Sequence, residues 1–337
     1  MGKLVIQVLV IHPGAFGDTL LALPVLAGIK RSYAPASLEL IGHPVLAELL
    51  PGRSVVDRMR SIDGPEWLAL LGDFEAIPPS LKGLFNACDL AIVWVADPED
   101  RLRSNLGRLG IRQVVVQSPR LREPGSKHAI ERFRETLGEL DRTIPIVPAP
   151  LVPTERDLAT GLSWLRQAGL AADRVPVVAV HPGGGSLFKC WPVEQFAALV
   201  GELHREGVEV VLIEGPADGT LVEALARKVA PLRSPRLANA DLATVLGVLA
   251  HCRAFMGNDS GLTHLAASLR MPTICLFGPT DPAVWAPRGD HVTMLRSMFA
   301  CRCPTDEEKR RCTSRICLTI PISVVREAMQ RAIFNPV

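Results

Sequence analysis

Runs rich in Val, Ile and Leu alternate with helical patterns along almost the whole chain. Strand-like runs fall at residues 4–11, 37–43, 89–96, 113–118, 175–183, 208–215, 254–259 and 272–282. Helical patterns fall between them or after them, at 19–33, 192–207, 218–230, 242–252, 261–270 and 322–333. Near-continuous apolar strands separated by helices indicate parallel sheets covered on both faces. The predicted fold class is therefore α/β.

The alternation is interrupted once, by the segment TIPIVPAPLVP at residues 143–153. Four prolines in eleven residues exclude a central strand or a helix here. A chain of 337 residues is long enough for two domains. We expect this segment to link two α/β halves, with a cleft between them that binds a ligand.

Composition narrows the class of partner. The chain has 37 Lys and Arg against 35 Asp and Glu, a net charge of +2, and no basic run interleaved with aromatic residues. This argues against nucleic-acid binding. The N-terminus lacks the features of a signal peptide, and no apolar run is long enough to span a membrane. The prediction is a soluble, intracellular protein, although a mean hydropathy of +0.22 leaves a peripheral membrane contact open.

Two similar strings lie half a chain apart: VIHPGAFGD at 10–18 and AVHPGGGS at 179–186. In the second, Gly183, Gly184 and Gly185 allow backbone amides to approach an anion closely, with a hydroxyl from Ser186 and a positive charge from Lys189. This pattern suits a diphosphate at a helix start, although a flexible turn with a solvated lysine has the same composition.

The stretch MGNDSGLTHLAASL, residues 256–269, carries the second polar cluster. Asp259 or Ser260 is placed to cap a helix that starts near Gly261, where free amides and the helix dipole favour an anion. His264 would lie in the first turn and face the same ligand. A capped helix with a hydrogen-bonded histidine remains the alternative. The turn FGPTDP at 277–282 should open on the same edge of the sheet.

In the first string, Asp18 follows the second of two glycines, Gly14 and Gly17. One interpretation makes Asp18 a helix cap. The other makes it a carboxylate base at the carboxyl end of a strand, within reach of an acceptor hydroxyl. His12 and His181, which make the two strings look alike, are expected to be structural rather than catalytic.

Several motifs together resemble glycosyltransferase family 9, the ADP-heptose:lipopolysaccharide heptosyltransferases. They occur in the family's order: GDTLLALP (17–24), KHAIERF (127–133), VHPGGGSLFKCWPVEQFAAL (180–199), MGNDSGLTHLAASL (256–269) and LFGPTDPAVWAP (276–287). The resemblance implies a GT-B fold of two Rossmann-like domains with a cleft between them. It divides the chain into an acceptor-side domain (1–150), a nucleotide-sugar domain (151–320) and a helix crossing back toward the first domain (321–337).

The resemblance also implies an activity, an inverting transfer of heptose or a related sugar from an ADP-activated donor to a lipopolysaccharide inner-core glycan. Carried over by position, Asp18 matches the general base and Lys189 the lysine that neutralises donor phosphate. Asp259 matches an acidic residue near the donor sugar. The remaining matches are Ser260, Gly261 and His264 at the nucleotide and Gly17 and His128 on the acceptor side. EGPADG (214–219) departs from the family pattern, and Asp218 is the donor-binding candidate there.

The implied partners are a nucleotide-sugar donor and a lipid-linked glycan acceptor, with no nucleic acid. No acidic metal-binding cage is evident, so we expect no cofactor to be required, with protein donors stabilising the leaving group. The expected location is the cytoplasm, with a peripheral contact at the cytoplasmic face of the inner membrane left open. The alternative function is a non-catalytic sugar-nucleotide-binding protein of the same fold.

Four of the eight cysteines cluster near the end of the chain: Cys301, Cys303, Cys312 and Cys317. Their spacing differs from the usual pairs of C-x-x-C but would allow a structural metal, and with it a metal-dependent regulatory module. Disulfides and free thiols are the other two possibilities. Lys309, Arg310 and Arg311 lie in the same segment, where they would form a solvated loop or touch an anionic acceptor or membrane surface.

Overall fold

The structure is a computed structural model that describes residues 5–64, 66–77, 79–85, 87–119 and 127–335. The chain divides into two compact units, Met1–Val152 and Pro153–Val337. Leu4, the first residue of the strand expected at 4–11, lies outside the described residues. Across the described residues, no helix combines the length and the apolar character needed to cross a membrane.

The first unit is a parallel sheet in the order β3-β2-β1-β4-β5. Its strands are β1 (Ile6–His12), β2 (Ala36–Gly42), β3 (Arg58–Ser61), β4 (Leu90–Val93) and β5 (Gln113–Val116). Its helices are α1 (Phe16–Ser32), η1 (Pro44–Leu46), α2 (Glu66–Ala69), η2 (Phe74–Ala76), α3 (Pro79–Phe85), α4 (Arg101–Arg108) and α5 (Ala129–Glu135). This is the strand order of a Rossmann half. Successive strands are added on one side of β1 up to β3 and on the other side from β4 on, so the order reverses between β1 and β4.

The hydrophobic pattern of β1 explains how this sheet is covered on both faces. Leu9 and Ile11 are buried in a cluster with Trp67 and Phe85. The intervening residue Val10 is fully buried too, and its side chain points to the opposite face because successive strand residues alternate. Burial on both faces is the reason for the continuous apolar run in the sequence.

The second unit repeats this plan with one strand more, in the order β11-β10-β9-β6-β7-β8. Its strands are β6 (Val177–His181), β7 (Glu209–Ile213), β8 (Arg236–Leu237), β9 (Ala254–Asn258), β10 (Thr273–Phe277) and β11 (Val292–Arg296). Its helices are α6 (Glu155–Gln167), η3 (Leu187–Lys189), α7 (Val193–Arg205), α8 (Gly219–Lys228), α9 (Leu242–Ala250), α10 (Gly261–Ser268), α11 (Pro282–Trp285), α12 (Asp306–Arg311), η4 (Ile316–Leu318) and α13 (Ile322–Phe334).

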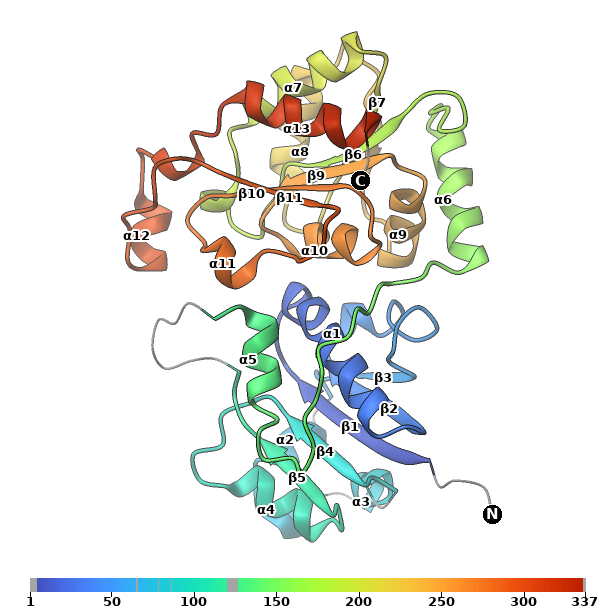
Figure 1. Ribbon diagram of the computed structural model, residues 1–337, viewed down its shortest axis with the longest axis vertical. Coiled ribbons are helices and arrows are strands. Elements are labelled where there is room, and N and C mark those ends of the chain that lie inside the picture. Colours follow the sequence, from blue (N-terminus) through green and yellow to red (C-terminus); the bar gives the residue numbers. More distant parts are fainter. Residues whose placement is uncertain (1–4, 65, 78, 86, 120–126, 336–337) are drawn as a thin grey trace. The chain divides into compact units, whose positions relative to one another are not determined.

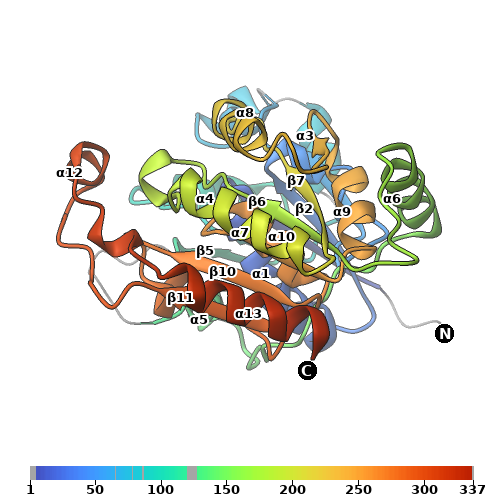
Figure 2. The same ribbon diagram turned by 90° about the horizontal axis from the view of Figure 1, so that it is seen from above.

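Helices cover both faces of this second sheet (Figures 1 and 2). On one face lie α7 and α13, whose buried residues Phe196 and Met329 join Val178 and Met256 of the strands in one core. On the other face lie α9 and α10. The last helix, α13, packs on α7, β9 and β10 of its own unit. Its crossing toward the first domain stays a prediction.

The proline-rich segment 143–153 contains neither helix nor strand. It is nevertheless held against the first unit by its backbone. The amide of Val147 donates to the carbonyl of Pro24 (3.0 Å), and the amide of Val152 donates to the carbonyl of Arg53 (2.9 Å). Most of the segment therefore belongs structurally to the first unit.

The second unit begins with α6. Its N-cap is Thr154, which forms a capping box with Asp157: the Thr154 amide donates to the Asp157 carboxylate at 2.7 Å, and the Asp157 amide donates to the Thr154 hydroxyl at 3.2 Å. Pro153 thus stands between a residue bonded within the first unit and a residue bonded within the second.

Candidate active site

The polar residues of the second unit gather at the topological switch point of its sheet, between β6 and β9. β6 and β9 are neighbours, with His181 beside Gly257 in the register. The chain leaves β6 toward β7 on one side and leaves β9 toward β10 on the other. Ligands of open α/β sheets bind at this point, outside the carboxyl ends of the strands.

The glycine loop after β6 is fixed by Asn258, the last residue of β9. Its side-chain amide donates to the carbonyls of Pro182 (2.7 Å) and Gly183 (2.9 Å), and its side-chain oxygen accepts from the amide of Trp191 (2.9 Å). Asn258 is completely buried. Its role was not predicted from the sequence.

The loop does not run directly into an α-helix. It enters η3, a short 3₁₀ helix that ends at Lys189, and α7 begins only at Val193. The helix predicted at 192–207 is confirmed as α7, and the three glycines are separated from its start by η3. The 3₁₀ turn instead carries Lys189 to the end of β9.

His181, the last residue of β6, connects three loops. Its Nε2 lies 2.8 Å from the Asp218 carboxylate before α8, and its Nδ1 lies 3.3 Å from the Ser260 hydroxyl. His181 is buried, and its partners Asp218 and Ser260 are half-buried. Through these contacts His181 positions the donor-site candidates Asp218 and Ser260, and its structural rather than catalytic role stays a prediction.

Asp218 lies beneath the glycine loop. Burial raises the pKa of Asp218. The hydrogen bond and charge of His181 and the amides of Gly215 and Gly184 lower it by more, so the pKa is below its ordinary value. A Cβ at Gly183 would lie 2.1 Å from the Asp218 carboxyl carbon, so only glycine fits there. Because the Gly184 amide is directed to Asp218, the loop has one donor fewer for an external anion.

Lys189 is held at the edge of the sheet by Asp259. The lysine ammonium donates to Asp259 Oδ2 at 2.8 Å, and the Thr280 hydroxyl donates to the same oxygen at 2.7 Å. Thr280 belongs to the turn after β10, which opens on this edge as predicted. The three residues come from three different loops, and together they hold the Lys189 ammonium, paired with the Asp259 carboxylate, beside the start of α10.

The start of α10 confirms one of the two predicted caps. Ser260 is the N-cap and accepts from the amide of Thr263 at 3.3 Å, whereas Asp259 pairs with Lys189. Gly261 is the first helical residue, and His264 is buried in the first turn. An eight-residue helix therefore directs its amino end toward the region that holds Lys189.

The first unit uses the loop after β1 differently. The His12 ring contacts Trp94 and Phe133 edge-on, with ring centroids 5.5 and 5.2 Å apart. A Cβ at Gly14 would lie 2.3 Å from this ring, which explains the glycine. The loop therefore wraps around an apolar anchor.

Asp18 lies in the first turn of α1, two residues after the start of the helix at Phe16. The N-cap of α1 is Ala15, so the interpretation of Asp18 as the cap residue was wrong. Gly17 is the second helical residue. His128 is the N-cap of α5 and accepts from the amide of Ile130 at 3.2 Å, which gives it a structural contact.

Sequence similarity to known proteins decides the family. The sequence profile of glycosyltransferase family 9 (heptosyltransferase) matches residues 108–313. Lipopolysaccharide heptosyltransferase 3 of Escherichia coli is 26% identical over 328 residues, which cover 88% of this chain and 90% of the relative. The chain belongs to glycosyltransferase family 9.

Two solved structures agree on the fold. A family 9 glycosyltransferase from Veillonella parvula superposes with a TM-score of 0.75, at 18% identity, over 99% of both chains. The E. coli ADP-heptose lps heptosyltransferase II gives a TM-score of 0.71, at 19% identity, over 98% of this chain and 99% of that one. The predicted GT-B fold class is confirmed, and the chain is a glycosyltransferase.

The late cysteines of this family 9 chain are not paired. All eight cysteines are free thiols, so the predicted alternative of disulfides was wrong for this state. Among the described residues, no three His, Cys, Asp or Glu side chains are arranged to hold a metal ion. The Ser314 hydroxyl and the Arg315 amide lower the pKa of Cys312 to about 7, whereas burial raises the pKa of Cys317 to about 11.

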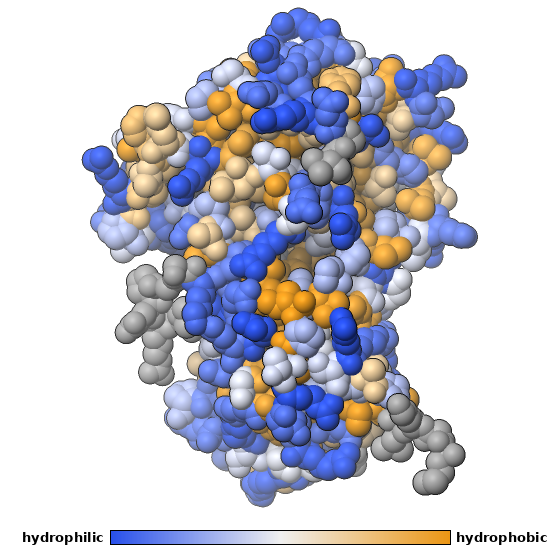
Figure 3. Space-filling view, in the orientation of Figure 1, coloured by the Kyte–Doolittle hydropathy of each residue, from blue (hydrophilic) through white to orange (hydrophobic). Residues whose placement is uncertain are grey.

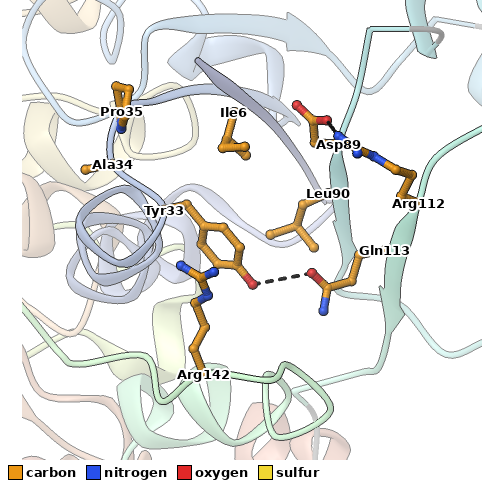
Figure 4. A pocket seen from close by; sticks show the side chains of 9 residues that line it. All are labelled: Ile6, Tyr33, Ala34, Pro35, Asp89, Leu90, Arg112, Gln113 and Arg142. Carbon is orange, nitrogen blue, oxygen red and sulfur yellow. Dashed lines mark hydrogen bonds and ion pairs between the residues drawn. The ribbon is translucent and has the colours of Figure 1, made fainter. Parts of the chain in front are cut away.

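One sizeable pocket of the first unit lies away from these loops (Figure 4). It has a volume of about 530 Å³ and is lined by Ile6, Leu90 and Gln113, which begin β1, β4 and β5. The Tyr33 hydroxyl faces Gln113 across it, at 3.4 Å from Oε1. Because it lies at the amino ends of the strands, it is at the opposite edge of the sheet from Asp18.

Proposed function

We propose that this glycosyltransferase moves a heptose from an ADP-activated donor to the inner core of lipopolysaccharide, or to a related lipid-linked glycan. The observation that carries the proposal is the fixed Lys189 ammonium beside the amino end of α10, at the point where the second sheet changes direction. The names of the similar proteins supply the sugar and the acceptor: lipopolysaccharide heptosyltransferase 3 and ADP-heptose lps heptosyltransferase II.

In this proposal the reaction is an inverting displacement. Asp18 takes the proton of the acceptor hydroxyl, and the hydroxyl oxygen attacks the anomeric carbon on the face opposite the diphosphate. The bond from this carbon to the diphosphate oxygen breaks, and ADP leaves. A carboxylate suits the first role because proton transfer by a positioned side chain lowers the barrier of such a step.

The departing diphosphate needs cations and amide donors. Lys189 supplies the charge, and the free amides at the start of α10, with the Ser186 hydroxyl, supply hydrogen bonds. The anionic Asp218 beneath Gly183 disfavours a second anion directly over the glycines. We therefore place the diphosphate nearer to Lys189 and α10 than to Gly183 and Gly184. No metal or other cofactor takes part in this scheme.

The test is a turnover assay of the full chain with ADP-heptose and a Kdo-containing acceptor, after treatment with EDTA. We expect ADP release coupled to glycoside formation, a product of inverted anomeric configuration, and a rate unaffected by the chelator. ADP-glucose and UDP-sugars serve as donor controls. Donor binding without turnover on any acceptor would instead support the non-catalytic sugar-nucleotide-binding alternative.

The proposed location is the cytoplasm, at the face of the inner membrane where a lipid-linked acceptor is presented. It follows from the proposed acceptor. Fractionation of cells that express the chain, with and without a high-salt wash of the membranes, tests it directly.

A further inference from the structure

Exposed apolar side chains gather at one edge of the second unit. Met298 is 88% exposed and Phe299 is 53% exposed, both directly after β11, and Leu187 of η3 is 66% exposed. Figures 1 and 2 show this segment and α12 extending away from the sheet, and Figure 3 shows residues of apolar character among hydrophilic ones on the same side. Large apolar side chains this exposed mark a contact surface when they occur together.

Hydrogen bonds and packing join the three residues into one surface. The Ser297 hydroxyl donates to the carbonyl of Ile316 (2.9 Å) and accepts from the amide of Phe299 (3.1 Å), which fixes the chain around Met298. The Arg315 guanidinium, one residue before Ile316, donates to the carbonyl of Leu187 at 3.4 Å. The helix α12 also packs on η3. We call residues 296–315 together with Leu187 the docking face.

The docking face carries an excess of positive charge. Residues 296–315 contain six basic and three acidic side chains. Two of the acids are neutralised locally, Asp306 by Lys309 (3.0 Å) and Glu307 by Arg311 (2.7 Å). Three exposed arginines form no ion pair with any residue that the structure describes: Arg296, Arg302 and Arg310.

Protruding Met and Phe side chains beside unpaired arginines are the combination that binds an anionic bilayer. The apolar groups enter the headgroup region, and each cation near the surface is attracted to acidic lipid. A second copy of the chain fits less well, because an isologous contact would place the same positive face against itself. Charge complementarity therefore favours acidic lipid over self-association.

We propose that the docking face binds the surface of a bilayer containing anionic phospholipid. The proposal rests on the proposed function for its purpose, because a lipid-linked acceptor lies in such a bilayer. The face borders η3, which carries Lys189, so lipid contact brings the donor site of the same unit to the membrane.

The test measures binding of the full chain, under reducing conditions, to vesicles. Vesicles of phosphatidylethanolamine with one quarter phosphatidylglycerol are compared with vesicles of phosphatidylcholine alone. We expect binding to the anionic vesicles, with the bound fraction falling as salt rises. Equal binding to both vesicle types, or none to the anionic ones at low salt, overturns the proposal.

Variants locate the surface. R302Q/R310Q should reduce vesicle affinity more than tenfold, since one basic residue contributes roughly fivefold. M298S/F299S should also reduce it, because the apolar side chains no longer enter the headgroup region. The matched control is V324S/F334S, which removes two exposed apolar side chains of α13, 41% and 53% exposed, and should bind as the wild type does. Unchanged binding of both docking-face variants overturns the assignment of the surface.

An activity readout separates this inference from the proposed function. On a water-soluble acceptor without lipid, M298S/F299S should turn over at the wild-type rate, and on acceptor in anionic vesicles it should be slower. Vesicle binding without any sugar transfer contradicts the proposed function while supporting the docking face. If M298S/F299S changes only the oligomeric state and leaves vesicle binding unaltered, the face is a contact between copies and the proposal fails.

Discussion

The loop after β1 and the loop after β6 occupy equivalent places in two sheets of the same strand order. Each follows the strand at which its sheet changes direction, and each begins with the sequence His-Pro-Gly. In the first, His12 lies edge-on between Trp94 and Phe133. In the second, His181 binds Asp218 and Ser260. One backbone arrangement supports an apolar anchor in one unit and a polar network in the other.

The difference comes from the neighbouring strand rather than from the loops themselves. β4 is followed by Trp94, whose amide donates to the carbonyl of Ile11. β9 ends in Asn258, which binds the loop backbone. In the first unit the Trp94 side chain packs at the switch point, and in the second unit the Asn258 side-chain amide hydrogen bonds to the loop backbone there. A shared motif therefore indicates a shared position in the fold, and its neighbours decide its chemistry.

The largest expected effect separates the chemical roles of the two loops. Asp18→Asn should lower kcat by about 10²–10⁴, because the proposed proton acceptor is lost. ADP affinity, measured by calorimetry, should stay unchanged because the donor contacts belong to the second loop. Asp63→Asn, an exposed carboxylate of the same unit, is the control. A wild-type rate in Asp18→Asn would leave the first loop without a chemical role.

The next effect concerns donor affinity. Lys189→Met should raise the Kd for ADP about 10- to 100-fold, since a hydrogen bond to a charged group is worth about 1.5–3 kcal/mol. Lys228→Met removes a lysine of α8 that pairs with Glu194 near the surface, and should leave ADP binding intact. Equal ADP affinity in wild type and Lys189→Met would remove this lysine from the phosphate site.

The two histidines, His12 and His181, should contribute differently to the stability of the protein. His181→Phe removes one hydrogen-bond partner from each of the half-buried residues Asp218 and Ser260 and should lower the free energy of unfolding by about 1–3 kcal/mol. His12→Phe should cost less, because a phenyl ring keeps the edge-on contacts with Trp94 and Phe133. Urea unfolding of the three proteins measures both values. If His12→Phe is the more destabilised, the comparison is wrong.

The two glycines provide a steric test of the same loops. Gly183→Ala should lower stability by about 1–2 kcal/mol, because its Cβ would meet the Asp218 carboxyl group, and Gly14→Ala should do so through the His12 ring. Gly201→Ala in α7 has open space around the new methyl group and should stabilise the helix. Thermal unfolding of the three variants ranks them, and a stabilised Gly183→Ala would contradict the packing described here.

The smallest effect depends on pH. The pKa of Asp218 is lower in the folded chain than its ordinary value of 3.8. Its ionised form therefore stabilises the fold above about pH 3.8, and this contribution is lost as the pH falls through the lower folded value. Asp218→Asn should be less stable than wild type near pH 6, with the gap closing on acidification. A stability difference between the two proteins that does not change with pH would show that the charge of Asp218 does not stabilise the fold.

Much of this architecture could be predicted because the signals are local. The buried strands have continuous apolar runs, and the cap at Ser260 follows from its place before a helical pattern. The helix α6 was overlooked although Thr154 and Asp157 carry a capping-box signal. β3, an edge strand with the sequence RMRS, gives no apolar pattern that could have marked it.

The polar network was not predictable from local patterns. His181 and Asp218 are 37 residues apart, and they meet because β6 and β7 are parallel neighbours whose following loops open on one edge. The role of Asn258 likewise depends on β9 lying beside β6. A polar residue after Gly257 at a strand end weakly indicates a functional position. Which loop the Asn258 side chain reaches depends on the register between β6 and β9.

The boundary at Pro153 has a mechanical consequence. Val152 is hydrogen bonded within the first unit and Thr154 within the second, so the covalent joint between the units is about one residue long. The ring of Pro153 fixes its φ angle, which leaves few backbone torsions to change at the joint. The connection between the two units is therefore a short, conformationally restricted joint and not a long flexible tether. Inserted glycines would add free torsions at this joint without touching either sheet.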